Sequence, residues 1–152
     1  MNNLTISKQH VLSAYRSESL EGKKVLEALF GNTVFQPITD RVKTFADACA
    51  VVGTTEQAVL ALSQTTDGQA YEKLKVVAQA LNEGWQPDWK NGNKYKWYPV
   101  FDMSGDRLVF YGAYFWYLRS AVGSRLCFET EEKAAYAGKQ FLDLFETLFV
   151  IQ

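Results

Sequence analysis

The chain has 152 residues, of which 47% are hydrophobic and 22% are charged, with a formal net charge of -1 and two cysteines. We expect a single globular domain over residues 1–152 with a substantial core. The composition excludes a uniformly basic nucleic-acid-binding protein, an acidic tail protein and a disulfide scaffold. No apolar run reaches the roughly 18 residues of a membrane span, and the first residues lack an apolar signal region, so we expect neither.

Residues 1–84 form the helical part of the prediction. Ser7, Ser19 and Thr44 each precede apolar residues at helical spacing and are therefore expected to cap the start of a helix. Gly84 is expected to end the longest helix of this part. That helix carries its apolar stripe at Tyr71, Leu74, Val77, Ala78 and Leu81.

Residues 85–128 are rich in aromatic side chains and change to a strand-like pattern. Turn residues at 91–93 and 103–106 separate runs that alternate or are dense in aromatic residues. We expect a small antiparallel sheet of three to four strands here. Its candidate strands are residues 95–101, 107–111, 114–118 and 125–128.

Residues 129–152 are expected to form one C-terminal helix packed across the sheet. Thr130 is the candidate N-cap, and the acidic residues that follow it favour the positive end of the helix dipole. Gly138 is expected to let this helix lie close to the sheet, with Lys139 on the solvent side. The fold class is therefore α+β, with a helical N-terminal half, a small sheet and a C-terminal helix.

The aromatic middle of the chain is also its basic part. Residues 85–128 hold six lysines and arginines against three acidic residues. If Leu108 and Phe110 face the core, alternation directs Arg107, Val109 and Tyr111 outward. Exposed rings beside cations suit single-stranded nucleic acid or a nucleotide. The alternative is that these rings fill the core while the lysines lie on the solvated face.

The segment 123–125 is a second candidate for anion binding. Gly123 suggests a positive φ or a close backbone approach, and Ser124 with Arg125 could hold a phosphate. The alternative is a turn in which Arg125 pairs with a carboxylate such as Glu129 or Glu132. Together with the sheet face, the candidate ligand-binding residues are Lys96, Trp97, Arg107, Tyr111, Trp116, Arg119, Ser124 and Arg125.

Catalytic patterns are weak. His10 is the one histidine and lies on a predicted surface helix, while Cys49 and Cys127 follow apolar patterns typical of buried thiols. Asp102 and Asp106 flank a hairpin loop, where aspartate is an ordinary turn residue. Nucleophile-elbow, phosphate-loop and metal-ligand spacings are not met. We therefore expect no catalytic residues, no metal and no cofactor; an enzyme using Asp102, Asp106 or Cys127 is the least favoured class.

Three stretches resemble a family signature: Lys94–Pro99 (KYKWYP), Val122–Phe128 (VGSRLCF) and Ala137–Phe141 (AGKQF). With segments further upstream, they are similar to an uncharacterised family of small proteins from Bacteroidetes bacteria, their phages and other mobile elements. The resemblance covers nearly the whole chain. It implies an origin in a bacterial cytoplasm or a virion and implies no substrate.

The function that we expect is a non-enzymatic binding module of phage or mobile-element origin. Its ligand would be nucleic acid or a nucleotide, held on the aromatic and basic sheet face. The alternative is a protein-interaction, virion-assembly or host-defence-inhibitor component, in which the same rings contact a protein partner and the cations form a rim. No membrane partner is expected.

Overall fold

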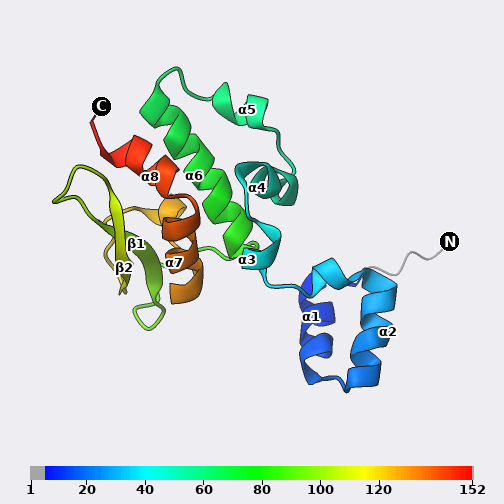
Figure 1. Cartoon of the computed structure of the whole chain (residues 1–152). Helices are drawn as coiled ribbons and strands as arrows, with labels where there is room; N and C mark the ends of the chain where they lie inside the picture. The colour runs from blue at the N-terminus through cyan, green and yellow to red at the C-terminus, as the bar shows by residue number, and fades with distance from the viewer. Residues whose placement is uncertain (1–5, 152) are drawn as a thin grey trace. The chain divides into compact units, whose positions relative to one another are not determined.

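The computed structural model describes residues 6–151 and has an α+β fold (Figure 1). The chain divides between Arg41 and Val42 into two compact units. The expectation of one domain over residues 1–152 stays a prediction, and its ends lie outside the described residues. Among the described helices, none has the length and apolar character to cross a membrane.

The first unit consists of short helices. It contains α1 (Lys8–Ser17), α2 (Leu20–Phe30), the 3-10 helix η1 (Asn32–Val34) and α3 (Ile38–Arg41). The predicted caps are confirmed: the Ser7 hydroxyl accepts from the His10 N–H, and the Ser19 hydroxyl accepts from the Gly22 N–H. Tyr15 of α1 links to α2 by a hydrogen bond to Glu27. These contacts join α1 and α2 as a helical pair.

The second unit is centred on α6 (Thr66–Asn82), which follows α4 (Phe45–Val52) and α5 (Glu56–Leu60). Thr44 caps α4, and Asp47 completes the capping box by accepting from the Thr44 backbone N–H. Four residues of the apolar stripe predicted for α6 are buried, Leu74, Val77, Ala78 and Leu81, whereas Tyr71 at its start is half-buried. Glu83 and Gly84 then adopt φ angles of 50° and 90°, which end the helix and turn the chain toward the sheet.

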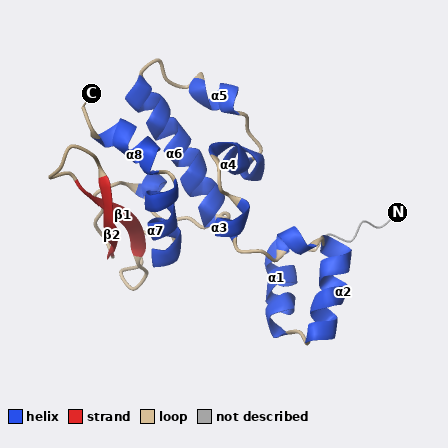
Figure 2. Cartoon of the chain, in the orientation of Figure 1, coloured by secondary structure: helices blue, strands red, loops and turns tan. Residues whose placement is uncertain are grey.

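The sheet has two strands, β1 (Lys96–Asp102) and β2 (Val109–Trp116), paired antiparallel as a hairpin (Figure 2). The prediction of three to four strands is wrong. The expected strands at 107–111 and 114–118 are one strand, because a bulge opposite Val100 and Phe101 lets the chain continue through Gly112. Residues 125–128 contribute only an isolated bridge between Phe128 and Trp97.

The segment before that bridge forms the 3-10 helix η2 (Ser124–Leu126). Gly123 precedes η2 at a φ of 72°, which confirms the positive φ suggested by the sequence. Because η2 coils residues 124–126 and only Cys127 is extended before the bridge, Phe128 alone of this segment pairs with β1. Backbone bonds of 3.0 and 2.7 Å join Phe128 to Trp97 on the edge of β1 away from β2.

The C-terminal segment is two helices instead of the one expected. α7 (Glu131–Gln140) is capped by Thr130 as predicted, and α8 (Leu142–Phe149) follows after a break at Phe141. The break serves two different packing surfaces: α7 packs on both strands, whereas α8 packs on α6. Figure 1 shows α7 beside the hairpin and α8 beside α6.

Gly138 allows the close approach of α7 to the sheet, as the sequence suggests. A Cβ atom at this position would lie 2.7 Å from the Pro99 Cβ and 2.7 Å from the Phe110 ring. Lys139 is exposed, and its ammonium lies 5.2 Å from the centroid of the Phe110 ring. The glycine therefore fixes which sheet face is covered by helix.

Asn82 anchors the end of α6 to the segment that pairs with β1. Its side chain is buried, donates to the Cys127 carbonyl at 2.9 Å and accepts from the Glu129 N–H at 3.1 Å. These two bonds satisfy backbone groups on both sides of Phe128. The Asn82 amide therefore ties the C-terminal end of α6 to the segment that pairs with β1.

Candidate functional site

The hairpin carries aromatic residues on both faces, and we call the exposed ones the hairpin surface. On the face that α7 covers in part, Tyr95, Phe115 and Tyr117 remain exposed beside Trp97. The ring centroids of Tyr95 and Phe115 are 4.4 Å apart, and those of Trp97 and Phe115 are 4.8 Å apart. A hydrogen bond with Tyr95 raises the pKa of Tyr117. These rings form one packed cluster that leaves ring area open to solvent.

The opposite face of β2 presents Tyr111, Tyr114 and Trp116. Tyr111 and Tyr114 are stacked with centroids 6.3 Å apart, and their side chains are 66% and 48% exposed. The charge and hydroxyl of Tyr111 raise the pKa of Tyr114. The expected outward direction of Tyr111 and Val109 is confirmed, as is the burial of Leu108. Alternation along β2 thus produces exposed rings on two faces instead of one core-facing set.

Three exposed cations accompany these rings. Lys94 precedes β1, Arg107 lies in the hairpin loop, and Arg119 follows β2. The ion pairs within residues 6–151 involve none of these side chains. Unpaired cations beside exposed rings leave both kinds of group available to an external ligand.

Lys96 was predicted as a ligand-binding residue, but the structure places it in a different role. Its side chain is 1% exposed, and its ammonium donates to the carbonyls of Asn91, Lys94 and Tyr117 at 2.9, 2.9 and 2.7 Å. The ammonium also lies 5.4 Å from the Trp89 ring centroid. All three N–H donors of the ammonium are therefore used within the chain.

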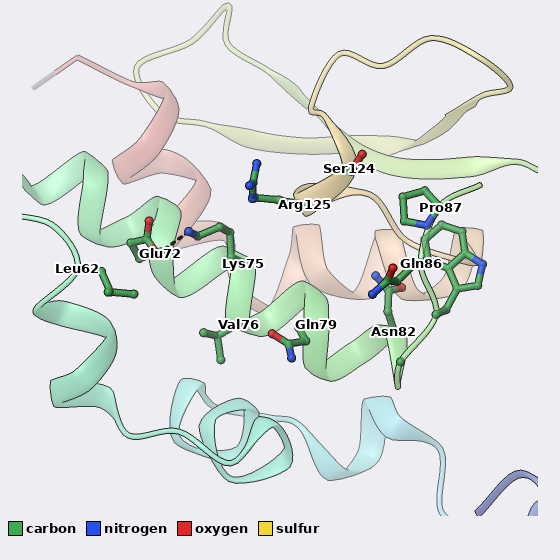
Figure 3. Close-up of a pocket in the computed structure, with 12 residues that line it drawn as sticks. Leu62, Glu72, Lys75, Val76, Gln79, Asn82, Gln86, Pro87, Ser124 and Arg125 are labelled. Carbon is green, nitrogen blue, oxygen red and sulfur yellow. Dashed lines mark ion pairs between the residues drawn. The ribbon is translucent and has the colours of Figure 1, made fainter. Parts of the chain in front are cut away.

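Ser124 and Arg125 lie in a groove apart from the hairpin aromatic residues (Figure 3). One wall is a face of α6, another is the connector after α6, and η2 supplies Ser124 and Arg125. The Ser124 hydroxyl accepts from the Trp89 indole N–H at 2.6 Å. The alternative pairing of Arg125 is absent among the described residues, where Glu129 pairs with Lys133 at 3.0 Å. The candidate residues therefore belong to two surfaces.

The surroundings of Cys127 and Asp102, two of the residues considered for catalysis, are those of a buried thiol and a turn aspartate. Burial raises the pKa of the Cys127 thiol to about 11, which opposes thiolate formation. Hydrogen bonds from Ser104 lower the pKa of Asp102, as in an ordinary turn. Within residues 6–151, no cluster of three or more histidine, cysteine or acidic residues could hold a metal ion.

Sequence reasoning missed the α6 side of the groove. Lys75, Gln79 and Asn82 line it, together with Gln86 of the connector. The sequence did show polar residues at helical spacing beside the apolar stripe of the longest helix, and a connector containing Gln86 directly after that helix. That pattern equally describes a solvated helix face, so only the position of η2 identifies the groove.

Comparisons with protein families, with curated proteins and with solved structures found no match to this chain. The resemblance to small proteins of Bacteroidetes bacteria and their phages therefore stays a prediction. The functional argument rests on the hairpin surface and on the groove alone.

Proposed function

We propose that the protein is a non-enzymatic binding module whose hairpin surface binds single-stranded nucleic acid. The observation that carries the proposal is the run Tyr114–Tyr117 at the end of β2 and just beyond it, in which all four residues are between 38% and 48% exposed. Each ring that stacks on a base contributes about 1–3 kcal/mol. Arg107 and Arg119 lie near the two ends of β2 without an internal ion pair and are placed to contact phosphates.

The chemistry of this surface matches a strand of unpaired bases better than a duplex. Stacking needs base faces, which a duplex hides, whereas cations alone would bind either form. The side chains of Tyr111 and Trp116 lie on the same face of β2 and could each receive one base. Because the contacts would be to ring faces and phosphates, we expect weak preference among base sequences.

The test is a fluorescence titration of the full chain with a short single-stranded DNA or RNA at low salt. Trp116 belongs to the hairpin surface, so base stacking should quench its emission. Each phosphate contact lowers the slope of log affinity against log salt by about 0.7 for a single strand. We expect Arg119→Ala to reduce the steepness of the salt dependence by about 0.7. Tyr111→Ala should weaken binding by about tenfold and leave the salt dependence unchanged.

The matched control is Lys24→Ala, which removes an exposed cation on α2 in the first unit. This variant should bind nucleic acid as the unmodified chain does. Equal losses in Lys24→Ala and Arg119→Ala would show a non-specific charge effect and would contradict the proposal. So would a titration with no saturable quenching at low salt.

The free edge of β2 favours a second candidate function, a protein partner that adds a strand. Within the described residues β2 pairs only with β1, and exposed Val109 and Leu118 lie at and just beyond its ends. Unprotected edges are templates for strand addition. A lysate partner, or self-association in solution, that shows little salt dependence and survives Arg119→Ala would favour this function over nucleic-acid binding.

A further inference from the structure

We propose that the groove between α6 and η2 is a separate site for a nucleoside monophosphate. The groove has a volume of about 670 Å³, within the size of sites for small organic ligands. Figure 3 shows its lining side chains distributed along α6, on the connector and on η2. The proposal uses no residue of the hairpin surface and is independent of the function proposed above.

The charge of the groove favours an anion. Lys75 contacts Glu72 at 2.6 Å, so these two charges compensate each other. Arg125 then leaves one uncompensated positive charge, since its exposed guanidinium has no ion pair or hydrogen bond among the described residues. A guanidinium presents a planar set of donors that matches a phosphate in a bidentate manner.

The remaining polar lining favours a base attached to that phosphate. Gln79 and Gln86 both line the groove, and neither side chain has a hydrogen bond within residues 6–151. A carboxamide offers a donor and an acceptor side by side, which is the pattern that pairs with a base edge. Asn82 cannot serve this purpose, because its amide is already bonded on both sides.

Trp85 supplies an apolar surface for the base. It is half-buried in the lining, and its backbone N–H donates to the Asn82 carbonyl at 2.9 Å. The positive φ angles of Glu83 and Gly84 produce the turn that permits this bond. The bond fixes the backbone of Trp85 at the end of α6, and its indole lines the same groove as the two glutamine side chains, where it offers a planar apolar surface to a base.

The experiment compares adenosine and guanosine monophosphates with adenosine and with inorganic phosphate, by calorimetry on the full chain. We expect at least one nucleotide to bind about tenfold more tightly than adenosine and than phosphate, because both parts of the ligand have partners. Arg125→Ala should abolish the advantage of the nucleotide over the nucleoside. Gln79→Ala should weaken binding of the nucleotide while leaving that of phosphate unchanged.

Arg119→Ala is the control, since it removes an equivalent exposed cation near the hairpin surface. It should leave nucleotide affinity unchanged, whereas Arg125→Ala should leave oligonucleotide binding by the hairpin unchanged. Both substitutions replace exposed side chains without internal partners, and thermal melts check that each variant is folded. The inference is overturned if no nucleotide binds, if Arg125→Ala binds it as tightly, or if phosphate alone binds equally well.

Discussion

Replacing Lys96 by methionine should destabilise the fold, although the sequence pattern places this lysine among ligand-binding residues. The methionine fills a similar volume but leaves the carbonyls of Asn91, Lys94 and Tyr117 without their donor. An unsatisfied buried polar group costs about 1–3 kcal/mol. Taking the low end for each carbonyl, since solvent reaches the loop in part, we expect the free energy of unfolding to fall by about 3 kcal/mol.

Urea denaturation followed by tryptophan fluorescence measures this loss. All four tryptophans lie in the second unit, so the signal reports the unit that contains Lys96. With a slope of about 1.5 kcal/mol per molar urea, the midpoint should move down by about 2 M. The control is Lys94→Met, which changes an exposed neighbour and should shift stability by less than about 0.5 kcal/mol. Equal midpoints for Lys96→Met and the unmodified chain would refute the assignment of the ammonium to a structural role.

Two further predictions concern packing and pH. Gly138→Ala should lower the free energy of unfolding by about 1–2 kcal/mol in the same assay, because the cost of overpacking against Pro99 and Phe110 exceeds the gain in helix propensity. A variant as stable as the parent would show that α7 can move away from the sheet without cost. The raised pKa of Cys127 stabilises the fold below pH 9, and this contribution is lost as pH rises toward 11, where the unfolded thiol ionises first. Over that range the parent should lose at most about 2 kcal/mol more than Cys127→Ala, and identical pH profiles would contradict the burial of the thiol.

Helix caps and strand alternation could be predicted from the sequence because each depends on residues only a few positions apart. Ser7, Ser19, Thr44 and Thr130 cap helices through bonds to residues three positions away. The alternation that buries Leu108 and exposes Tyr111 is likewise a property of one strand. The break at Phe141 was missed because a single apolar stripe runs through both helices, and it arises from packing on two different surfaces.

The partners of Lys96, and the fact that Arg125 forms no ion pair among the described residues, could not be predicted, for opposite physical reasons. Lys96 is held by backbone carbonyls, which every residue possesses, so no side-chain pattern marks the partners. Arg125 has acidic residues nearby in sequence, yet Glu129 pairs with Lys133 one helical turn away instead. The number of strands was overestimated for two reasons. The bulge joins residues 109–116 into one strand, and residues 124–126 form a 3-10 helix, which a short segment adopts as readily as a strand.

The two bonds of Asn82 have a consequence for the order of folding. They connect residues separated by 45 and 47 positions, so the chain must close a long loop before they form. The hairpin, in contrast, joins adjacent strands through a short turn and can form early. A partly folded chain would then present stacking rings without a groove. The groove is complete only when the slowest contacts are made, and nucleotide affinity would therefore report the fully folded second unit.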